Sequence, residues 1–287
     1  MCQPQPLPAL LLLLCCAWAS ASSLRGRIVG GHEARPHSHP YMAFLKFADM
    51  GGCGGFLVAP NWVMSAAHCM GNITVILGAH NIHEPEKTQQ VRGVLKYHEH
   101  PEYNPSTMEN DIMLLQARSS EGAEGLWGHQ GPSRARPGSF CKAASARGAG
   151  GTWEGAMGRL TSKVAVNDYV QPIPLPRTGS DLPTGTKCVI AGWGLIDEDR
   201  TTNKLFETKV SIYSRRKCSL FYPNLDSGMV CAGSFHELKD SSQGDSGGPL
   251  VCNKVAQGIV SFGYDSPPGV YTRISNYLPW IKKVMKK

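Results

Sequence analysis

The stretch Lys239–Cys252, KDSSQGDSGGPLVC, combines three serines and two aspartates with a Gly-Gly-Pro turn. A serine hydroxyl is a weak nucleophile at neutral pH, so serine catalysis needs a base within hydrogen-bond reach and a third group that orients the base. Glycines on both sides of Ser246 allow backbone N–H groups to turn toward a developing oxyanion. Ser246 is therefore the candidate nucleophile of this stretch.

Two other stretches contain the partners that such a serine needs. SAAHC at 65–69 presents His68 beside Cys69, a cysteine that could lock its loop. ENDIMLL at 109–115 places Asp111 at the head of an apolar run. These residue types predict a base and a carboxylate that holds the base, provided that the fold brings them together.

The start of the chain has the features of a secretory signal. Residues 1–21 contain no acidic residue, include the run Leu10–Leu14, and end in Ala19-Ser20-Ala21. This fits a short apolar core and a small-residue cleavage site. No later stretch approaches the roughly 18 apolar residues of a membrane span. We expect a secreted, soluble protein in an oxidising compartment, without a membrane span.

The positive charge of the chain is unevenly placed. Formal net charge is +7 at pH 7, but Arg25 and Arg27 lie upstream of the expected mature start. Residues 117–159 contribute a further part of the net positive charge, with six basic and three acidic residues. The rest is weakly charged, which gives little support to a polyanion-binding field, and we expect no nucleic acid partner. The Arg215-Arg216-Lys217 cluster is interpreted as solvated surface.

Apolar runs in the chain are short and are separated by Gly, Pro, Asn and Asp turns. This pattern predicts an all-β sandwich or barrel. Apolar residues at helical spacing occur only at Asn276–Val284, where Pro279 is tolerable in a first turn. We therefore expect a single, C-terminal helix. The expected strands include Tyr41–Phe47, Gly55–Val58, Ile73–Leu77, Cys188–Ala191 and Ala256–Phe262.

Residues 117–159 depart from this pattern of short apolar runs and turns. The segment is rich in Gly, Ala, Ser and Arg and has no β period. Its composition predicts a disordered insertion. A long structureless loop inside a compact domain is unusual, so the segment is either a functional surface loop or the product of a splice variant or gene model.

Several motifs together resemble the trypsin-like serine proteases of the chymotrypsin fold. The order His, Asp, Ser along the chain also agrees with that family. Similarity to the leukocyte and mast-cell granule branch, the chymases, cathepsin G and granzymes, is seen in PHSHPYMA at 36–43 and AQGIVS at 256–261. The family motifs are IVGG at 28–31, SAAHC at 65–69, NDIMLL at 110–115, AGWG at 191–194, GDSGGPLVC at 244–252 and GVYTRIS at 269–275.

The resemblance implies two packed antiparallel six-stranded β-barrels with the active site between them. Ser246 would attack the scissile carbonyl, His68 would act as base and acid, and Asp111 would orient His68. Backbone N–H groups of Gly244 and Ser246 would form the oxyanion hole. Ser261, Phe262 and Gly263 would pair with the substrate backbone as an added strand would. The implied function is a serine endopeptidase that needs no cofactor.

The resemblance also implies a specificity and an activation route. Asp240 lies where trypsins carry the carboxylate at the base of the primary pocket, and Gly263 and Gly269 match positions that leave the pocket open. A carboxylate there would select Arg or Lys. Cleavage after Arg27 would free the α-amino group of Ile28 to pair with Asp245, so we expect a zymogen.

The chain departs from the trypsins in two places. Ser242 stands where trypsins carry a cysteine, and the loop at 264–268 is short and lacks its partner. Loss of this disulfide is typical of the granule branch. The expected propeptide, 22–27, ends Leu-Arg-Gly-Arg, whereas granule proteases usually end theirs with an acidic dipeptide. Activation by a trypsin-like protease, which includes the protein itself, is the resulting hypothesis.

Seven of the ten cysteines remain after removal of the signal. By resemblance Cys53 pairs with Cys69, Cys188 with Cys252, and Cys218 with Cys231. Cys141, the odd one, lies in the insertion. The expected organisation is a signal peptide at 1–21, a propeptide at 22–27, an N-terminal barrel at 28–116, the insertion at 117–159, and a linker, the C-terminal barrel and the helix at 160–287.

The remaining expectations concern modification, partners and alternatives. Asn72-Ile73-Thr74 is an acceptable glycosylation sequon. The histidines lack the spacing of metal ligands, so no metal site is expected.

Expected partners are protein or peptide substrates, an activating protease, serine protease inhibitors and an anionic proteoglycan. Storage in leukocyte secretory granules is also expected. The alternatives are a catalytically inactive binding protein and an isoform that misfolds because of residues 117–159.

Overall fold

The computed structural model describes residues 31–48, 51–117, 164–177, 179, 182–197, 200–234, 244–264 and 267–286. The proposed signal peptide, the propeptide, all of 118–159 and Asp240 lie outside this part of the chain. Within it, no helix is long and apolar enough to cross a membrane.

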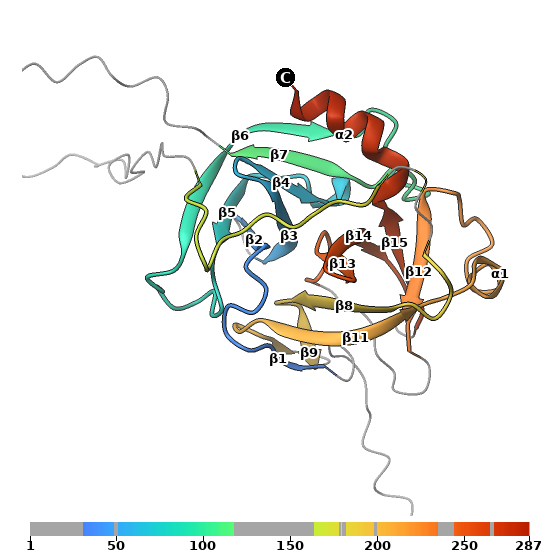
Figure 1. Ribbon diagram of the computed structural model, residues 1–287, viewed down its shortest axis with the longest axis horizontal. Helices are drawn as coiled ribbons and strands as arrows, with labels where there is room; N and C mark the ends of the chain where they lie inside the picture. Colours follow the sequence, from blue (N-terminus) through green and yellow to red (C-terminus); the bar gives the residue numbers. More distant parts are fainter. Residues whose placement is uncertain are drawn as a thin grey trace, which may run out of the picture.

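Six antiparallel strands close into an N-terminal barrel (Figure 1). Around the barrel their order is β2-β3-β4-β7-β6-β5. The interior is filled by apolar side chains such as Leu45, Phe56 and Leu114, which are all fully buried. The strands are β2 (Met42–Phe47), β3 (Gly52–Ala59), β4 (Trp62–Ser65), β5 (Ile73–Leu77), β6 (Gln90–Glu99) and β7 (Met113–Ala117).

Six further strands form a second, C-terminal barrel, which is closed by the pairing of β11 with β8. Strand β1 (His32–Glu33) adds to the edge of β11, and β9 (Leu195–Asp197) pairs with β10 (Arg200–Thr201). The strands of this barrel are β8 (Lys187–Gly192), β11 (Phe206–Ile212), β12 (Met229–Gly233), β13 (Pro249–Cys252), β14 (Val255–Phe262) and β15 (Gly269–Arg273). The all-β prediction of two six-stranded antiparallel barrels is confirmed.

The C-terminal helix is present where the spacing predicts it. Helix α2 (Leu278–Met285) follows the 3-10 turn η2 (Ile274–Tyr277) and carries Pro279 in its first turn, where proline costs no hydrogen bond. Its buried residues Leu278, Ile281 and Val284 belong to the same core cluster as the N-terminal barrel. Figure 1 shows α2 beside β6 and β7, so the end of the chain ties the two halves together.

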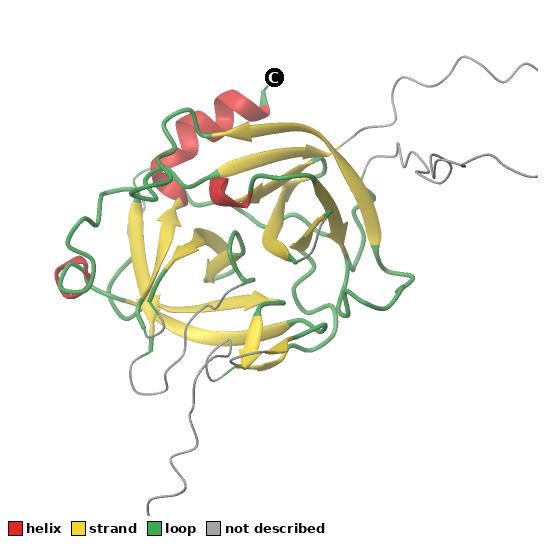
Figure 2. Ribbon diagram, turned by 180° about the vertical axis from the view of Figure 1, so that it is seen from behind, coloured by secondary structure: helices red, strands yellow, loops and turns green. Residues whose placement is uncertain are grey.

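The prediction of a single helix was wrong. A second, four-residue helix, α1 (Arg215–Cys218), leads away from β11. Ser214 caps it by accepting a hydrogen bond from the Lys217 N–H at 3.3 Å. The view from behind in Figure 2 shows α1 at the edge of the molecule. Its sequence Arg-Arg-Lys-Cys is too short and too polar to produce a helical apolar period.

Three disulfides join neighbouring elements, as the resemblance implied. Cys53–Cys69 links β3 to the 3-10 turn η1 (Ala67–Cys69), and Cys218–Cys231 links α1 to β12. Cys188 and Cys252 lie opposite each other on β8 and β13 and form the third. Cross-links of this kind stabilise a secreted domain mainly by restricting its unfolded chain.

Candidate active site

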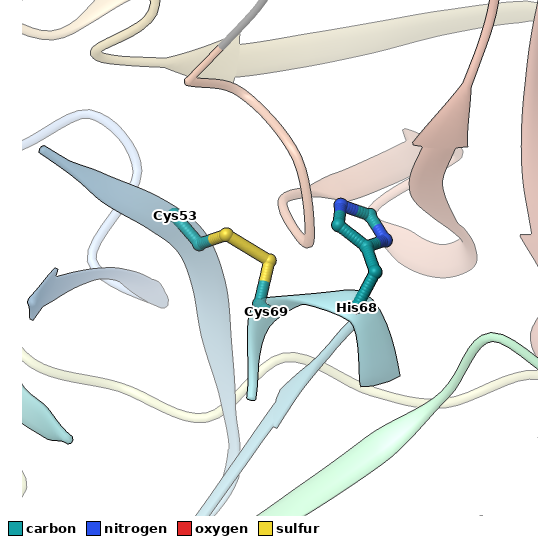
Figure 3. Close-up of side chains that lie close together, drawn as sticks. All are labelled: Cys53, His68 and Cys69. Carbon is teal, nitrogen blue, oxygen red and sulfur yellow. A yellow bond between two sulfur atoms is a disulfide. The ribbon is translucent and has the colours of Figure 1, made fainter. Parts of the chain in front are cut away.

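His68 lies on η1, between β4 and β5. Both of its neighbours, Ala67 and Cys69, are buried, and Cys69 is covalently fixed to β3 through Cys53. Figure 3 shows the imidazole projecting from this turn on the side away from the disulfide bond. The side chain is 23% exposed, so the turn presents a positioned imidazole with access to solvent.

Asp111 holds this imidazole from the start of the segment that leads into β7. The carboxylate is completely buried, and its Oδ1 accepts the His68 backbone N–H at 3.0 Å. Its Oδ2 lies 2.8 Å from His68 Nδ1. Since an ionised carboxylate can only accept, Nδ1 must carry the proton. In the neutral imidazole the other ring nitrogen, Nε2, then has a lone pair and can act as a base.

The C-terminal barrel supplies two further contacts to Asp111. Ser261 on β14 donates its hydroxyl to Asp111 Oδ2 at 2.5 Å, and Thr272 on β15 donates to the Asp111 backbone oxygen at 2.8 Å. Both hydroxyl residues are buried. Asp111 is therefore fixed by side chains of both barrels, which makes the site dependent on their packing.

Loss of the Ser261 hydroxyl should weaken catalysis without abolishing it. A hydrogen bond to a charged group contributes about 1.5–3 kcal/mol, so we expect Ser261→Ala to lower kcat/KM about tenfold. The change should appear in kcat rather than KM, because Ser261 acts on Asp111. Steady-state kinetics on a peptide substrate measures both constants.

Ser219→Ala is the matched control, because the Ser219 hydroxyl donates to the Arg215 oxygen on exposed α1. It should leave both constants unchanged. An unaltered kcat in Ser261→Ala would show that the hydroxyl does not help to position Asp111.

Ser246 lies in the turn that precedes β13, beside the loop of His68. Its backbone oxygen accepts the Gly54 N–H at 2.7 Å and lies 3.6 Å from Cys69 Sγ, a disulfide sulfur without a proton. Gly247, the next residue, donates its N–H to the Val260 oxygen at 2.8 Å. Contacts to both barrels thus hold the serine near His68.

Two glycines of this turn adopt a conformation that other residues rarely take. Gly244 has φ +93° and Gly247 has φ +81°, in the region where a Cβ atom is disfavoured. A Cβ on Gly244 would lie 2.8 Å from the Gly194 Cα, and one on Gly247 would overlap with Ser65 Oγ. Glycine is therefore needed at positions 244 and 247, where the backbone conformation and the close neighbours leave no place for a Cβ.

The Asp245 side chain contacts the backbone at the end of β8. It is 3% exposed, and its Oδ1 accepts the Gly194 N–H at 3.0 Å. A Cβ on Gly192 would overlap with this carboxylate. Asp245 is therefore packed against the end of β8, directly next to Ser246. Its proposed partner Ile28, like Arg27, lies outside the described residues.

The residues predicted to line the substrate pocket are only partly described. Gly263 and Gly269 face each other, since a Cβ on Gly263 would lie 3.4 Å from the Gly269 Cα. Phe262 meets the ring of Tyr222 edge-on, with the centroids 5.7 Å apart. The structure thus brings four of the five predicted substrate-binding residues to one end of β14 and the start of β15, while Asp240 lies outside the described part.

Tyr222 is a residue of this region that the sequence analysis missed. Its hydroxyl donates to the Pro268 oxygen at 2.8 Å, and its ring stacks on that of Tyr264 at 5.0 Å. Tyr264 is 67% exposed. An exposed aromatic ring next to Gly263 offers an apolar surface to a bound peptide. Tyr222 and Tyr264 are 42 residues apart in the sequence, and no local spacing connects their rings.

One group of described side chains is close enough to hold a metal ion, Cys53, His68 and Cys69. Its two sulfurs form a disulfide (Figure 3). Metal binding by cysteine needs the thiolate, so this group is not a metal centre. Among the other histidines, His39 and His80 pair with the carboxylates of Glu207 and Glu33.

Comparison with known proteins agrees with this geometry. The family model described as Trypsin matches residues 28–150 and 142–281. Duodenase-1 of Bos taurus is 42% identical, over 96% of this chain and 96% of that protein. Human cathepsin G is 40% identical, over 98% of this chain and 95% of that protein. The chain belongs to the trypsin family and is a serine endopeptidase.

Further relatives place the chain near the granule proteases, as the sequence motifs indicated. "Granzyme B(G,H)" of Mus musculus is 41% identical, over 96% of this chain and 98% of that protein. The solved structure entitled "Structure of GrC" superimposes with a TM-score of 0.71 at 35% identity, covering 90% of this chain and 99% of that one. The family assignment and the two-barrel fold are therefore confirmed.

Proposed function

We propose that His68, Asp111 and Ser246 carry out the peptide hydrolysis of this enzyme. The observation that supports it best is the double contact of Asp111 with His68, which orients the ring and leaves Nε2 as the acceptor in the neutral imidazole. Ser246 Oγ attacks the scissile carbonyl carbon while its proton passes to His68 Nε2. The proton then goes to the leaving amine as the C–N bond breaks, and water hydrolyses the acyl-enzyme by the same steps.

The oxyanion of each tetrahedral intermediate needs donors on the Ser246 side of the site. We assign the backbone N–H groups of Gly244 and Ser246 to this role. The positive φ of Gly244 supports the assignment, because it turns the backbone away from a regular strand. The substrate strand would lie along Ser261–Gly263, at the end of β14, where Phe262 and Gly263 are not fully buried.

The proposed specificity is cleavage after Arg and Lys. A Cβ on Gly263 would come within 3.4 Å of the Gly269 Cα, so larger side chains at these positions would fill the proposed primary pocket, and Asp240 would provide a carboxylate at its base. Only a long cationic side chain can pair with a carboxylate in such a slot. The disulfide that trypsins carry at this loop is absent, in agreement with the shortness of the loop at 264–268. Tyr264 and Pro268 in this loop are hydrogen-bonded to the Tyr222 hydroxyl instead.

Paired peptide substrates that differ only in Arg or Phe before the scissile bond test this specificity. We expect a higher kcat/KM for the Arg substrate. In Asp240→Ser this kcat/KM should fall about 100-fold or more, because the charge pair between Asp240 and the substrate cation is lost. Asp168→Ser, at an exposed position, is the control and should behave as wild type. A preference of the wild type for Phe would refute the proposal.

The same assay should be made on a version that lacks residues 118–159. Ala117 is kept because it is buried at the end of β7 and its N–H donates to the Asn61 oxygen at 2.8 Å. We propose that the removed segment is an insertion into the protease fold. The family model matches the chain in two stretches that overlap at 142–150 rather than in one continuous stretch, and this break inside the segment supports the proposal. Activity in the shorter version alone would mean that the segment blocks the enzyme.

The enzyme is proposed to be secreted as a zymogen, with residues 1–21 as signal and 22–27 as propeptide. Cleavage after Arg27 would create the α-amino group of Ile28. Asp245, buried next to Ser246, is the proposed counter-ion. The position of Asp245 supports the proposal that its pairing with the Ile28 α-amino group shapes the oxyanion hole. Protein substrates and serine protease inhibitors are the expected partners, with an activating protease and an anionic proteoglycan proposed in addition.

Storage in secretory granules of leukocytes and glycosylation are further parts of this proposal. Asn72 is exposed in the turn before β5, where a glycan would not disturb either barrel. This position supports the sequon as an acceptor site.

A further inference from the structure

A cavity of about 880 Å³ lies away from the catalytic residues. None of His68, Asp111 and Ser246 lines it. Its walls come from residues 38–41, from the linker between the barrels at 171–174, and from β8, β11, β13 and the turn after β13 in the C-terminal barrel. Figure 1 shows the linker, in yellow, running from one barrel to the other. The volume lies within the range of small-molecule sites.

One wall of the cavity is apolar and rigid. Pro40, Pro172 and Pro174 line it together with Tyr41 and Ile173. Backbone hydrogen bonds fix this wall, including Gln171 N–H to the Pro40 oxygen and Ala256 N–H to the Pro174 oxygen, both at 3.0 Å. Proline has a fixed φ and no N–H to satisfy. The wall is therefore already formed and suits a hydrocarbon or aromatic body.

The opposite wall carries cations. Lys187 on β8 and Lys209 on β11 point outward from the barrel, and Lys254 follows in the turn between β13 and β14. Lys187 Nζ donates to Ser211 Oγ at 2.9 Å. All three lysines are exposed, and none of the described residues that line the cavity is Asp or Glu. The charge of this wall is therefore positive and is not balanced within the cavity.

Polar side chains also line the cavity from the same stretches, and they add no negative charge: Ser38, His39, Tyr41 and Gln171. Tyr41 lies 2.9 Å from His39 Nδ1, and His39 Nε2 pairs with Glu207. A carboxylate on Nε2 leaves Nδ1 as the acceptor of the Tyr41 hydroxyl in the neutral imidazole. Burial, and then the charge of Glu207, raise the pKa of Tyr41. The phenol stays neutral, and the carboxylate of Glu207 is occupied by histidines.

We propose that this cavity binds an amphipathic carboxylate, with its hydrocarbon body against the proline wall and its carboxylate between Lys209 and Lys254. A charged head group gains charge-assisted hydrogen bonds from ammonium groups, while the prolines and Tyr41 take apolar surface out of water. The site goes beyond the proposed peptidase function, because it shares no residue with the catalytic constellation.

Calorimetric titration of the full chain with dodecanoate, below its micellar concentration, tests the proposal. We expect one binding site for dodecanoate in the wild type, and binding of dodecanol that is weaker by about tenfold or more, because dodecanol lacks the charge. The double variant Lys209→Gln/Lys254→Gln should bind dodecanoate about tenfold more weakly or worse. Both lysines are exposed, so its kcat/KM on a peptide substrate should equal that of the wild type.

Lys282→Gln/Lys283→Gln on α2 is the matched control, since it removes the same charge from exposed residues outside the cavity. Its affinity for dodecanoate should not change. Absence of binding to the wild type overturns the proposal. It is also overturned if Lys209→Gln/Lys254→Gln binds with wild-type affinity, or if the α2 control loses as much affinity.

Discussion

Replacement of Ser246 by alanine should lower kcat about 10⁶-fold, and His68→Ala should lower it equally. In a serine, histidine and aspartate constellation the nucleophile and the base act as one unit, so loss of either removes the whole covalent route. The double variant Ser246→Ala/His68→Ala should therefore be no slower than either single variant. The measurement is kcat on an Arg peptide, with each protein first cleaved after Arg27.

Exposed residues of the same types provide the controls. Ser106→Ala and His83→Ala lie in exposed loops and should keep wild-type kcat. The unfolding temperature of each variant separates a loss of chemistry from a loss of fold. If the fold-decrease in kcat of the double variant equalled the product of the two single decreases, Ser246 and His68 would act independently.

Asp111→Asn should lower kcat at neutral pH about 10⁴-fold, as expected for this constellation. Three donors converge on the carboxylate, from the backbone and ring of His68 and from the hydroxyl of Ser261. An amide has one oxygen and a donor group, so it cannot accept from all three. If its NH₂ group faces His68, Nδ1 must become the acceptor. Nε2 then carries the proton and can no longer take one from Ser246.

The appropriate control is Asp168→Asn, which makes the same change on an exposed carboxylate. It should leave kcat unaltered. A decrease of less than about tenfold in Asp111→Asn would contradict the proposed role of Asp111 in fixing the imidazole tautomer.

The strands that could be predicted are those with a buried, apolar face. Ile73–Leu77 and Tyr41–Phe47 appear almost unchanged as β5 and β2. Strand β6 was not predicted, because its ten residues are mostly polar and only Arg92 among them is buried. It is held by pairing with β5 and β7 on its two sides. Pairing of this kind depends on distant chain segments and leaves no local period.

The catalytic candidates could be predicted because each lies in a dense local motif. The structure places His68 and Asp111 in direct contact and brings Ser246 to the loop of His68. The side-chain roles of Ser261 and Thr272 were missed, although both lie in stretches that resemble the family. Their contacts with Asp111 span 150 and 161 residues of chain and arise only when the two barrels pack together.

Covalent labelling with an organophosphonate that carries an Arg-like side chain tests the central claim most directly. After cleavage behind Arg27, the labelled protein would be digested and the modified peptide identified by mass spectrometry. We predict one adduct, on Ser246, and none in His68→Ala, because the unassisted hydroxyl is a weak nucleophile. An adduct on another residue, or no adduct on the wild-type protein, would contradict the assignment of Ser246 as the nucleophile.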